Sequence, residues 1–193
     1  MKHKSVLLDE VINSLNIQEN KMYIDGTVGY GGHSSEVLKR LGKEGFLFAF
    51  DQDDDAIAFS NDRLSKIGNN FKIFKSNFKN MKNFIDEKVD GIMFDLGVSS
   101  PQLDEDERGF SFHRDARLDM RMDRTQELDA YKVVNEYSYD KLVSIFFKYG
   151  EEKFSRKIAK NICEYRKNKE ISTTKELVEI IDKSIPGFAK KNG

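Results

Sequence analysis

Short apolar runs alternate with segments of helical spacing through the first hundred residues of the chain. The runs have the length of strands and are bounded by Gly, Asn or Asp. They cover residues 22–25, 45–51, 71–75 and 89–96. Between them, residues 34–41 and 56–67 carry apolar side chains at helical intervals. Strands joined by helical crossovers form a parallel sheet, and ligands of such sheets bind beyond the carboxyl ends of the strands. The pattern predicts an open α/β sheet with a site at that edge.

The segments on both sides of this region have helical patterns. Before the first strand, residues 5–12 read as an amphipathic helix capped by Ser5. From about Glu127 onward, apolar and charged positions alternate at helical spacing. The last helix opens with Thr173 and, three positions later, Glu176, which together form a capping box. The other helices expected here cover residues 130–136, 139–149 and 152–167.

Composition limits the class of protein. The chain has 193 residues, of which 38% are apolar, and no apolar run approaches the length of about eighteen residues that a membrane span needs. A single cysteine, Cys163, excludes an internal disulfide. The 32 basic and 33 acidic side chains nearly cancel, so any nucleic-acid surface must come from local clustering. We expect a soluble globular protein of the cytoplasm, with no membrane partner.

The segment from Tyr23 to Ser34 reads as a strand that runs into a glycine-rich turn and then opens a helix. Glycine lacks a Cβ, so it adopts positive φ and lets a ligand approach the backbone, while the start of a helix offers free N–H groups. A Walker phosphate loop would need Gly-Lys-Ser or Gly-Lys-Thr, and the dinucleotide fingerprint would need Gly or Ala where Ser34 stands. The turn predicts a nucleotide-sized pocket of another kind.

Two further positions suit an adenosine. Asp51 ends the second strand twenty positions after Gly31, where a carboxylate accepts hydrogen bonds from both ribose hydroxyls. The alternative role for Asp51 is the N-cap of the next helix. Because one of the aspartates at 53–55 can supply that cap, Asp51 is expected to be free for the ligand. Phe78, after the third strand, either covers the face of the base or packs in the core.

The acid before the glycines indicates which adenosine-containing ligand the pocket binds. Asp25, followed by glycines at alternate positions, resembles the first motif of class I S-adenosylmethionine-dependent methyltransferases, with Thr27 where the first glycine usually lies. The cofactor that this resemblance implies is cationic and carries both an ammonium and a carboxylate. Asp25 suits the cation, and N–H groups near Gly31, Gly32 and His33 suit the carboxylate.

The string after the fourth strand starts at Asp95 and contains Ser99, Ser100 and Gln102 around a proline. Methyltransferases that act on an exocyclic amine carry an acid or amide and a proline at this place. Acceptors that bind the amine hydrogens make its conjugated lone pair more available. Asp95 is therefore our candidate contact to cofactor or amine, and the other three side chains can fix a base edge. An ordinary turn around the proline is the alternative.

Three further strings point to a family. Residues 107–112 read Glu-Arg-Gly-Phe-Ser-Phe, residues 117–123 read Arg-Leu-Asp-Met-Arg-Met-Asp, and residues 3–8 read His-Lys-Ser-Val-Leu-Leu. Together with the glycine turn and the Asp95 string, they resemble the bacterial small-subunit (16S) ribosomal RNA cytosine-N4 methyltransferases. The resemblance covers essentially the whole chain and continues through residues 149–152 and 171–177. Arg117 departs from it, since the family commonly has proline there.

The resemblance implies a fold and a division of the chain. The fold is α/β, a Rossmann-like class I methyltransferase sheet that is incomplete here, with its first four parallel strands and a mostly helical inserted subdomain. Residues 1–126 are expected to form the S-adenosylmethionine-binding core with an active-site arm, and residues 127–193 the helical subdomain. The chain stops at Gly193, before the remaining core strands of the family. Residues 92–94 are therefore expected at an open sheet edge, which either pairs two copies into a homodimer or leaves the sheet only marginally stable.

The implied activity is methylation of N4 of a cytidine in the decoding region of 16S rRNA in the small ribosomal subunit, with S-adenosyl-L-methionine as cofactor and no metal. Asp95, Ser99 and Ser100 are the catalytic candidates. Two alternatives stay open: methylation of another nucleic-acid amine, and cofactor binding without turnover by an incomplete chain. The resemblance carries cofactor contacts to Gly31, Gly32, His33, Asp51, Phe78, Asp95 and Gln102, with Asp25 and Gly29 in support.

Two charged segments bear on contact with RNA. Residues 148–170 carry eight Lys or Arg against four Glu, which fits either an RNA-facing surface or a solvated helix face. In the arm from Asp104 to Asp123, arginines suited to phosphates are interspersed with acids, which indicates internal pairing. Only one or two arginines of the arm are expected to reach RNA.

Overall fold

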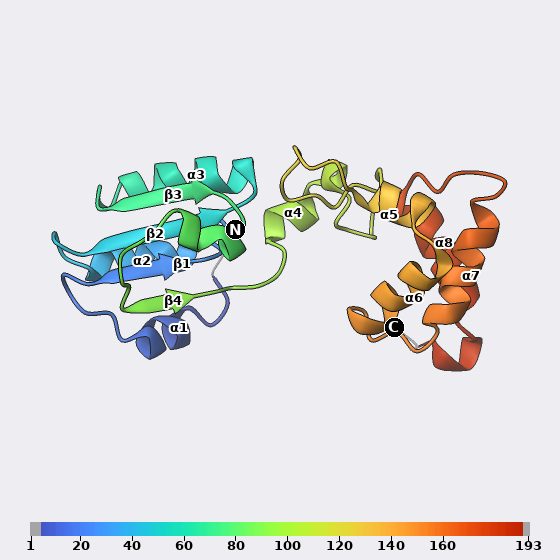
Figure 1. Ribbon diagram of the computed structural model, residues 1–193, viewed down its shortest axis with the longest axis horizontal. Coiled ribbons are helices and arrows are strands. Elements are labelled where there is room, and N and C mark those ends of the chain that lie inside the picture. The colour runs from blue at the N-terminus through green and yellow to red at the C-terminus, as the bar shows by residue number, and fades with distance from the viewer. Residues whose placement is uncertain (1–4, 191–193) are drawn as a thin grey trace. The chain divides into compact units, whose positions relative to one another are not determined.

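The computed structural model describes residues 5–190, which pack into two compact units (Figure 1). The first unit ends at Ser99 and the second begins at Ser100. Each unit has a buried apolar core of its own, one around a sheet and one among helices. No helix within residues 5–190 is both long enough and apolar enough to cross a membrane.

The first unit is built on a four-stranded parallel sheet with the order β3-β2-β1-β4. Its strands are β1 (Met22–Asp25), β2 (Phe46–Asp51), β3 (Phe71–Lys75) and β4 (Gly91–Met93). They are accompanied by α1 (Leu8–Leu15), α2 (Gly32–Arg40), α3 (Asp54–Ser65) and the 3-10 helix η1 (Phe78–Asn83). The predicted α/β fold is confirmed, and the ranges of the first and third strands agree residue for residue. The fourth strand is shorter than predicted, because β4 finds a partner only along the last three residues of β1.

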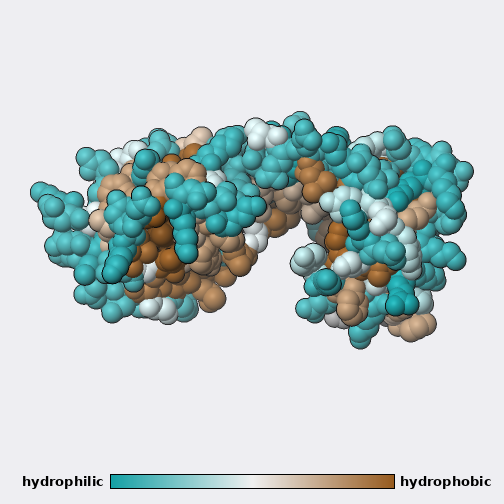
Figure 2. Space-filling model, in the orientation of Figure 1, coloured by the Kyte–Doolittle hydropathy of each residue, from teal (hydrophilic) through white to brown (hydrophobic). Residues whose placement is uncertain are grey.

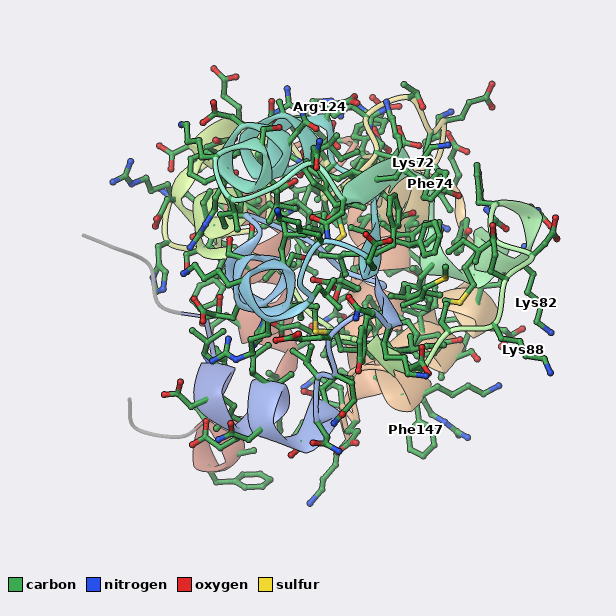
Figure 3. All side chains as sticks on the ribbon, turned by 90° about the vertical axis from the view of Figure 1, so that its left-hand side faces the viewer. Lys72, Phe74, Lys82, Lys88, Arg124 and Phe147 are labelled. Atoms are coloured by element: carbon green, nitrogen blue, oxygen red, sulfur yellow. The ribbon has the colours of Figure 1, made fainter. Side chains whose placement is uncertain are left out.

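The two faces of the sheet bury different side chains. On one face, apolar residues of α1, α2 and α3 pack on strand residues such as Leu47 and form the main core. On the other face, the ring of Phe74 lies 5.0 Å from that of Phe50 and 5.0 Å from that of Phe84, measured between centroids. Lys72 covers Phe74, with Nζ 4.8 Å from the ring centroid (Figure 3). The second face is therefore aromatic and lies closer to solvent.

β4 is one of the two outer strands of the described sheet, and β3 is the other. It pairs with β1, and Ile92 and Phe94 are 43% and 47% exposed. Figure 2 shows hydrophobic side chains gathered at the surface over the strands of this unit. For residues 5–190, the expected position of residues 92–94 at a sheet edge is confirmed. The pairing of two copies through that edge stays a prediction.

The helix before the sheet begins later than predicted. α1 starts at Leu8, and its N-cap is Leu7, which has a φ of 49° and makes no side-chain capping bond. The prediction that Ser5 caps this helix is therefore wrong. A leucine with positive φ turns the chain sharply before α1, and Ser5 lies beside Gly32 of α2 instead.

The second unit is helical. After the short α4 (Ser100–Asp104) and η2 (Asp106–Arg108) come α5 (Ala130–Glu136), α6 (Tyr139–Lys148), α7 (Ser155–Tyr165), α8 (Thr174–Ser184) and η3 (Gly187–Ala189). The helices expected at 130–136, 139–149 and 152–167 are present as α5, α6 and α7. The predicted capping box of Thr173 and Glu176 at the start of α8 is confirmed.

The arm between η2 and α5 packs with the helices. Leu118 is 1% exposed in the core of the second unit, and its N–H donates to the carbonyl of Ser172 over 3.0 Å. Arg117 forms an isolated antiparallel bridge with Thr173. The prediction assigned the arm to the cofactor-binding core, with a division after residue 126, because of the candidate active-site residues in the arm. By packing, the boundary between the two compact units lies before the arm, at residues 99–100.

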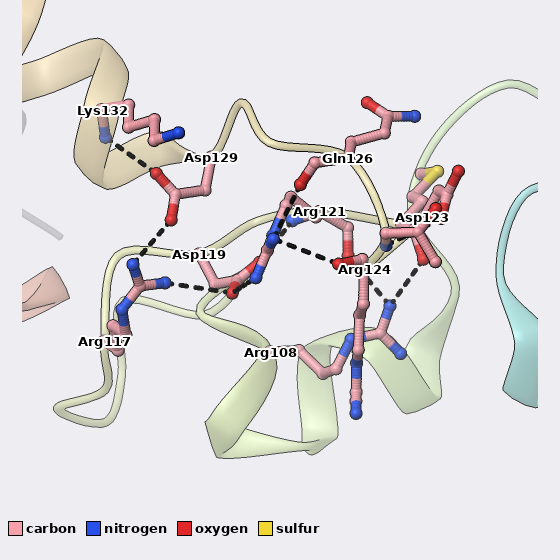
Figure 4. A network of polar contacts seen from close by, with 11 residues as sticks. Arg108, Arg117, Asp119, Arg121, Asp123, Arg124, Gln126, Asp129 and Lys132 are labelled. Carbon is pink, nitrogen blue, oxygen red and sulfur yellow. Dashed lines mark hydrogen bonds and ion pairs between the residues drawn. The ribbon is translucent and has the colours of Figure 1, made fainter.

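The arginines and acids of the arm pair with one another (Figure 4). Arg121 donates to both oxygens of Asp119, over 2.8 and 2.7 Å, and this pairing lowers the pKa of Asp119. Arg117 reaches Asp119 over 3.1 Å and Asp129, the N-cap of α5, over 2.7 Å. Arg108 is only 3% exposed and donates to the carbonyl of Arg121 over 3.1 Å. The internal pairing expected from the sequence is confirmed.

Gly109→Ala is expected to destabilise the arm. Gly109 has a φ of 68°, and an added Cβ would lie 2.4 Å from the carbonyl oxygen of Arg117. A backbone clash at a left-handed residue should lower the free energy of unfolding by about 2–4 kcal/mol. Gly187→Ala is the control, because no atom lies within 4 Å of a Cβ added there. Urea unfolding compares the two variants, and equal stabilities would contradict the prediction.

Candidate functional site

The turn after β1 has the backbone conformation that its glycines were predicted to allow. Gly29 and Gly31 have φ values of 48° and 74°, in the left-handed region where a Cβ costs about 1–2 kcal/mol. The N–H of Gly31 donates to the carbonyl of Val28 over 2.8 Å, and the N–H of Val28 donates to the carbonyl of Phe50 in β2 over 2.9 Å. The turn is therefore tightly wound and joined to the neighbouring strand.

Asp25 ends β1 with a buried carboxylate. It accepts hydrogen bonds from the Oγ of Ser34 over 2.6 Å and from the N–H of Thr27 over 3.1 Å, and the residue is 2% exposed. Burial raises the pKa of Asp25 to about 6, although both hydrogen bonds act in the opposite direction. Within residues 5–190, no lysine or arginine pairs with it. A buried carboxylate of this kind favours a cationic ligand.

Asp51 ends β2 and binds the glycine turn. Its Oδ2 accepts from the N–H of Gly29 over 2.8 Å, while Oδ1 accepts from the N–H groups of Gln52 and Asp53 over 2.7 and 3.0 Å. Asp53, one of the three aspartates expected to supply the cap, is the N-cap of α3 and accepts a hydrogen bond from the N–H of Asp55 over 3.1 Å. Asp51 is therefore not the cap of α3, as expected, and its carboxylate holds three backbone N–H groups. Its role toward a ligand stays a prediction.

Thr27 joins the glycine turn to the end of β4. Its Oγ accepts a hydrogen bond from the N–H of Asp95 over 2.7 Å, and the N–H of Gly26 donates to the carbonyl of Met93 over 2.9 Å. The side chain of Asp95 itself is 56% exposed. The ends of β1, β2 and β4 are thus bound to one turn, and the Asp95 carboxylate remains accessible beside it.

His33 connects the site to the segment that precedes α1. Its imidazole is buried, with Nε2 3.1 Å from the carbonyl oxygen of Val6 and Nδ1 3.7 Å from Oδ2 of Asp95. At Gly32, an added Cβ would lie 1.8 Å from the Oγ of Ser5. The segment 5–7 therefore lies against the start of α2, in a close approach that glycine permits.

A cavity of about 170 Å³ opens among these elements. Three predicted site residues share it, and two of them are acids. Apolar side chains supply the rest of its lining, so that charge and hydrophobic contact are available to one ligand. The polar lining comes from Asp25, His33 and Asp95, and the apolar lining from Val6, Leu7, Val11, Met93 and Phe94.

Phe78 lies close to the glycine turn, at the start of η1. Its ring centroid is 5.0 Å from that of Phe94. A Cβ built on Gly26 would lie 2.3 Å from the ring of Phe94 and 3.4 Å from the Cβ of Phe78. Phe78 is half-buried, so it packs and still keeps part of its surface accessible.

The remaining candidates follow β4. Ser99 is half-buried at the end of the first unit, and Ser100 begins α4 of the second. Pro101 stands in the first turn of that helix, a position proline tolerates, so a short helix replaces the ordinary turn considered above. Gln102, also in α4, is 4% exposed. The cofactor and catalytic roles of these residues stay predictions.

Sequence reasoning did not identify Ser34, Thr27 or the segment 5–7 as parts of the site. Ser34 stands where the dinucleotide fingerprint has Gly or Ala, and Thr27 where the methyltransferase motif usually has its first glycine. Each of these departures supplies a hydroxyl that binds the end of a strand. The departures were therefore the available signal. The contact of residues 5–7 with α2 could not be predicted from the sequence, because it depends on the bend of the backbone at Leu7.

A sequence model of the MraW methylase family matches residues 1–193, the whole chain. Among curated proteins, the chain is 54% identical over 196 aligned positions to the ribosomal RNA small subunit methyltransferase H of Oceanobacillus iheyensis. The match takes in 100% of this chain and 60% of that protein. The chain therefore spans about 60% of the length of this curated relative.

Solved structures match about half of the chain. A Clostridium thermocellum protein proposed to be an rRNA methylase is 26% identical, with a TM-score of 0.46, over 50% of this chain and 54% of that one. An rRNA methylase from Streptococcus thermophilus is 19% identical, with a TM-score of 0.42, over 50% of this chain and 57% of that one.

Asp25→Asn is expected to change the pH dependence of stability. Between about pH 4 and pH 6, the unfolded chain has lost the Asp25 proton while the folded protein keeps it. Raising the pH through this window therefore lowers the unfolding free energy of the wild type, by about 3 kcal/mol in total. The asparagine variant lacks this component. Urea unfolding at several pH values measures it, with Asp86→Asn at an exposed position as control. Parallel profiles for Asp25→Asn and wild type would contradict the expectation.

Thr27→Val keeps the side-chain shape and removes the acceptor of the Asp95 N–H. We expect the free energy of unfolding to fall by about 1 kcal/mol and hydrogen exchange at the Asp95 amide to accelerate. Exchange followed by NMR measures this rate. Thr125→Val in the second unit is the control, since the Thr125 hydroxyl binds Asp123. An unchanged rate at Asp95 would show that the hydroxyl does not hold the end of β4.

Proposed function

The chain belongs to the MraW methylase family, and from this membership and the site we propose that it is an S-adenosylmethionine-dependent methyltransferase of small-subunit ribosomal RNA. We place the reaction at N4 of a cytidine in the decoding region, in the cytoplasm. The observation that carries the proposal is the buried Asp25 carboxylate, in one cavity with His33 and Asp95 at the carboxyl ends of parallel strands. The name of the curated relative supports ribosomal RNA as the substrate.

The residues of the cavity fit this cofactor, which supplies an electrophilic methyl group on a sulfonium. A cationic group near Asp25 would favour the ionised carboxylate and lower the pKa that burial has raised. Affinity should therefore rise as the pH passes about 6. The N–H groups of Gly32 and His33, in the first turn of α2, offer donors for a carboxylate, while the N–H of Gly31 is bound to Val28. Met93 and Phe94 suit the apolar part of the ligand.

Asp51 and Phe78 are proposed to hold the adenosine part. Oδ2 of Asp51 accepts one N–H, from Gly29, and a carboxylate oxygen has a second lone pair for a ribose hydroxyl. Phe78, half-buried beside Phe94, offers the rest of its surface to a base. Gln102 is proposed as a further contact, on the resemblance alone.

Asp95 is proposed to act on the amine. The bound cofactor would supply the methyl group to N4 and keep the electron pair of the broken carbon–sulfur bond, so the nitrogen would have a proton to release. The Asp95 carboxylate accepts a hydrogen bond from the amine, makes its lone pair more available and takes this proton. The backbone of Asp95 is fixed by Thr27, while its side chain is accessible to a base. Ser99 and Ser100 are proposed to bind the edge of that base.

The cytidine must leave its stack to reach this site. Extrusion costs about a few kcal/mol, and the base is then read at its Watson–Crick edge. Orientation of the amine toward the methyl group supplies most of the rate acceleration, because it makes a bimolecular reaction effectively unimolecular.

Asp95→Ala is expected to slow methylation of small ribosomal subunits by about a hundredfold or more, the usual size of such acid–base contributions. Transfer of labelled methyl groups to subunits that lack the modification measures the rate, and calorimetric titration with S-adenosylmethionine measures binding. Asp86→Ala, at an exposed acid of the same unit, is the control. Normal methylation with unchanged cofactor affinity would overturn the role of Asp95. Mass mapping of the product nucleotide tests the assignment to cytidine N4.

A further inference from the structure

The last turn of α6 and the residue that follows the helix expose two aromatic rings. Phe147 is 63% exposed and Tyr149 is 83% exposed. Figure 3 shows the ring of Phe147 standing away from the ribbon. Neither ring stacks on another ring or on a cation within residues 5–190. We call residues 147–157 the aromatic-basic turn.

The backbone of this turn is fixed in the conformation that exposes the rings. At Gly150, an added Cβ would lie 2.8 Å from the carbonyl oxygen of Phe146. Glu151 has a φ of 49°, which is uncommon for a residue other than glycine. The N–H of Glu152 donates to the carbonyl of Phe146 over 3.1 Å, and its carboxylate accepts from the N–H of Phe154 over 2.7 Å. The turn therefore has a defined structure, and one of its two acids is engaged within it.

Basic side chains without partner acids lie close to the two aromatic residues in the sequence. Lys148, Lys153, Arg156 and Lys157 are all exposed, and none of them forms an ion pair within the described part of the chain. Many other cations of the second unit do pair with acids. These are Arg114, Arg117, Arg121, Lys167, Lys169 and Lys190.

Helix stability does not explain the position of these cations. Arg156 and Lys157 lie in the first turn of α7, which has no acid in that turn. The helix dipole disfavours cations at this end. Their placement fits an anion supplied by a partner.

We propose that the aromatic-basic turn binds single-stranded RNA, with bases stacked on Phe147 and Tyr149 and phosphates held by the four cations. Proteins that hold single strands combine stacking on aromatic side chains with cations along the backbone of the nucleic acid. A protein partner would also cover the rings, but four unpaired cations in the same short segment favour a polyanion. The inference rests on the proposed function and deepens it, because it names a surface of the helical unit that holds the ribosomal RNA.

Removal of both rings is the first test. Phe147→Ala/Tyr149→Ala should weaken binding of an unstructured oligocytidine by about tenfold or more, because both stacking platforms are lost. Tyr149→Phe should keep the affinity, since the ring remains. Phe188→Ala is the matched control, at a ring that is 90% exposed elsewhere in the same unit. Fluorescence anisotropy measures affinity, and circular dichroism confirms the fold.

Removal of cations is the second test. Lys153→Ala/Arg156→Ala should reduce the slope of log affinity against log salt by about 0.7 for each cation lost. Lys167→Ala is the control, since Lys167 pairs with Glu164. Unchanged affinity and slope in the ring and cation variants would overturn the proposal. A changed sedimentation mass with unchanged RNA affinity would also overturn it, because the surface would then contact protein.

Failure of the proposed function would appear differently. The wild-type protein could bind the oligocytidine through this turn and yet transfer no methyl group to small subunits. That result would support the RNA-binding surface and contradict the proposed reaction. Ring variants that bind S-adenosylmethionine normally, bind RNA weakly and methylate slowly would support both.

Discussion

One short backbone turn, bound by the ends of three strands, organises the first unit. The last residues of a parallel strand have backbone groups without ladder partners, and buried groups of this kind must find them elsewhere. Asp51 supplies an acceptor to Gly29, and Thr27 supplies one to Asp95. The third strand end, Asp25, keeps its carboxylate buried, and burial raises its pKa to about 6. The ionised form is unfavourable for folding at neutral pH, and the same feature prepares the site for a cation.

The helical unit separates its charges into two kinds of surface. In the arm, Arg117 and Arg121 are bound to Asp119, and Leu118 fixes the segment in the apolar core. These cations hold the arm together. The cations of the aromatic-basic turn have no such partners within residues 5–190. A net charge of −1 therefore conceals a local distribution in which the arm pairs arginines with its own acids, while the aromatic-basic turn presents positive charge to solvent.

The elements could largely be predicted, and the errors have physical causes. Strand lengths, helical spacing and the capping box at Thr173 are set by neighbours within a few residues, so they can be read from the chain. Ser5 did not cap α1, because a left-handed Leu7 intervenes. The hydrogen bond from the N–H of Gly29 to Asp51 was not predicted, because it depends on how β2 lies beside β1. The contact of the arm with the helical core could not be predicted either, because the burial of Leu118 depends on tertiary packing.

The sequence by itself determined the parallel α/β pattern, the helical second half, the glycine turn and the acids around it. Only the tertiary structure decided how these acids work. It buries Asp25 under Ser34, turns Asp51 toward the glycine turn and brings the N–H of Asp95 to Thr27, 68 residues away in the chain. Hydrogen bonds of that span depend on strand order and register, which local spacing does not encode. Exposure of Tyr149 is likewise a property of the packed helices, since the residue type alone suits a core as well as a surface.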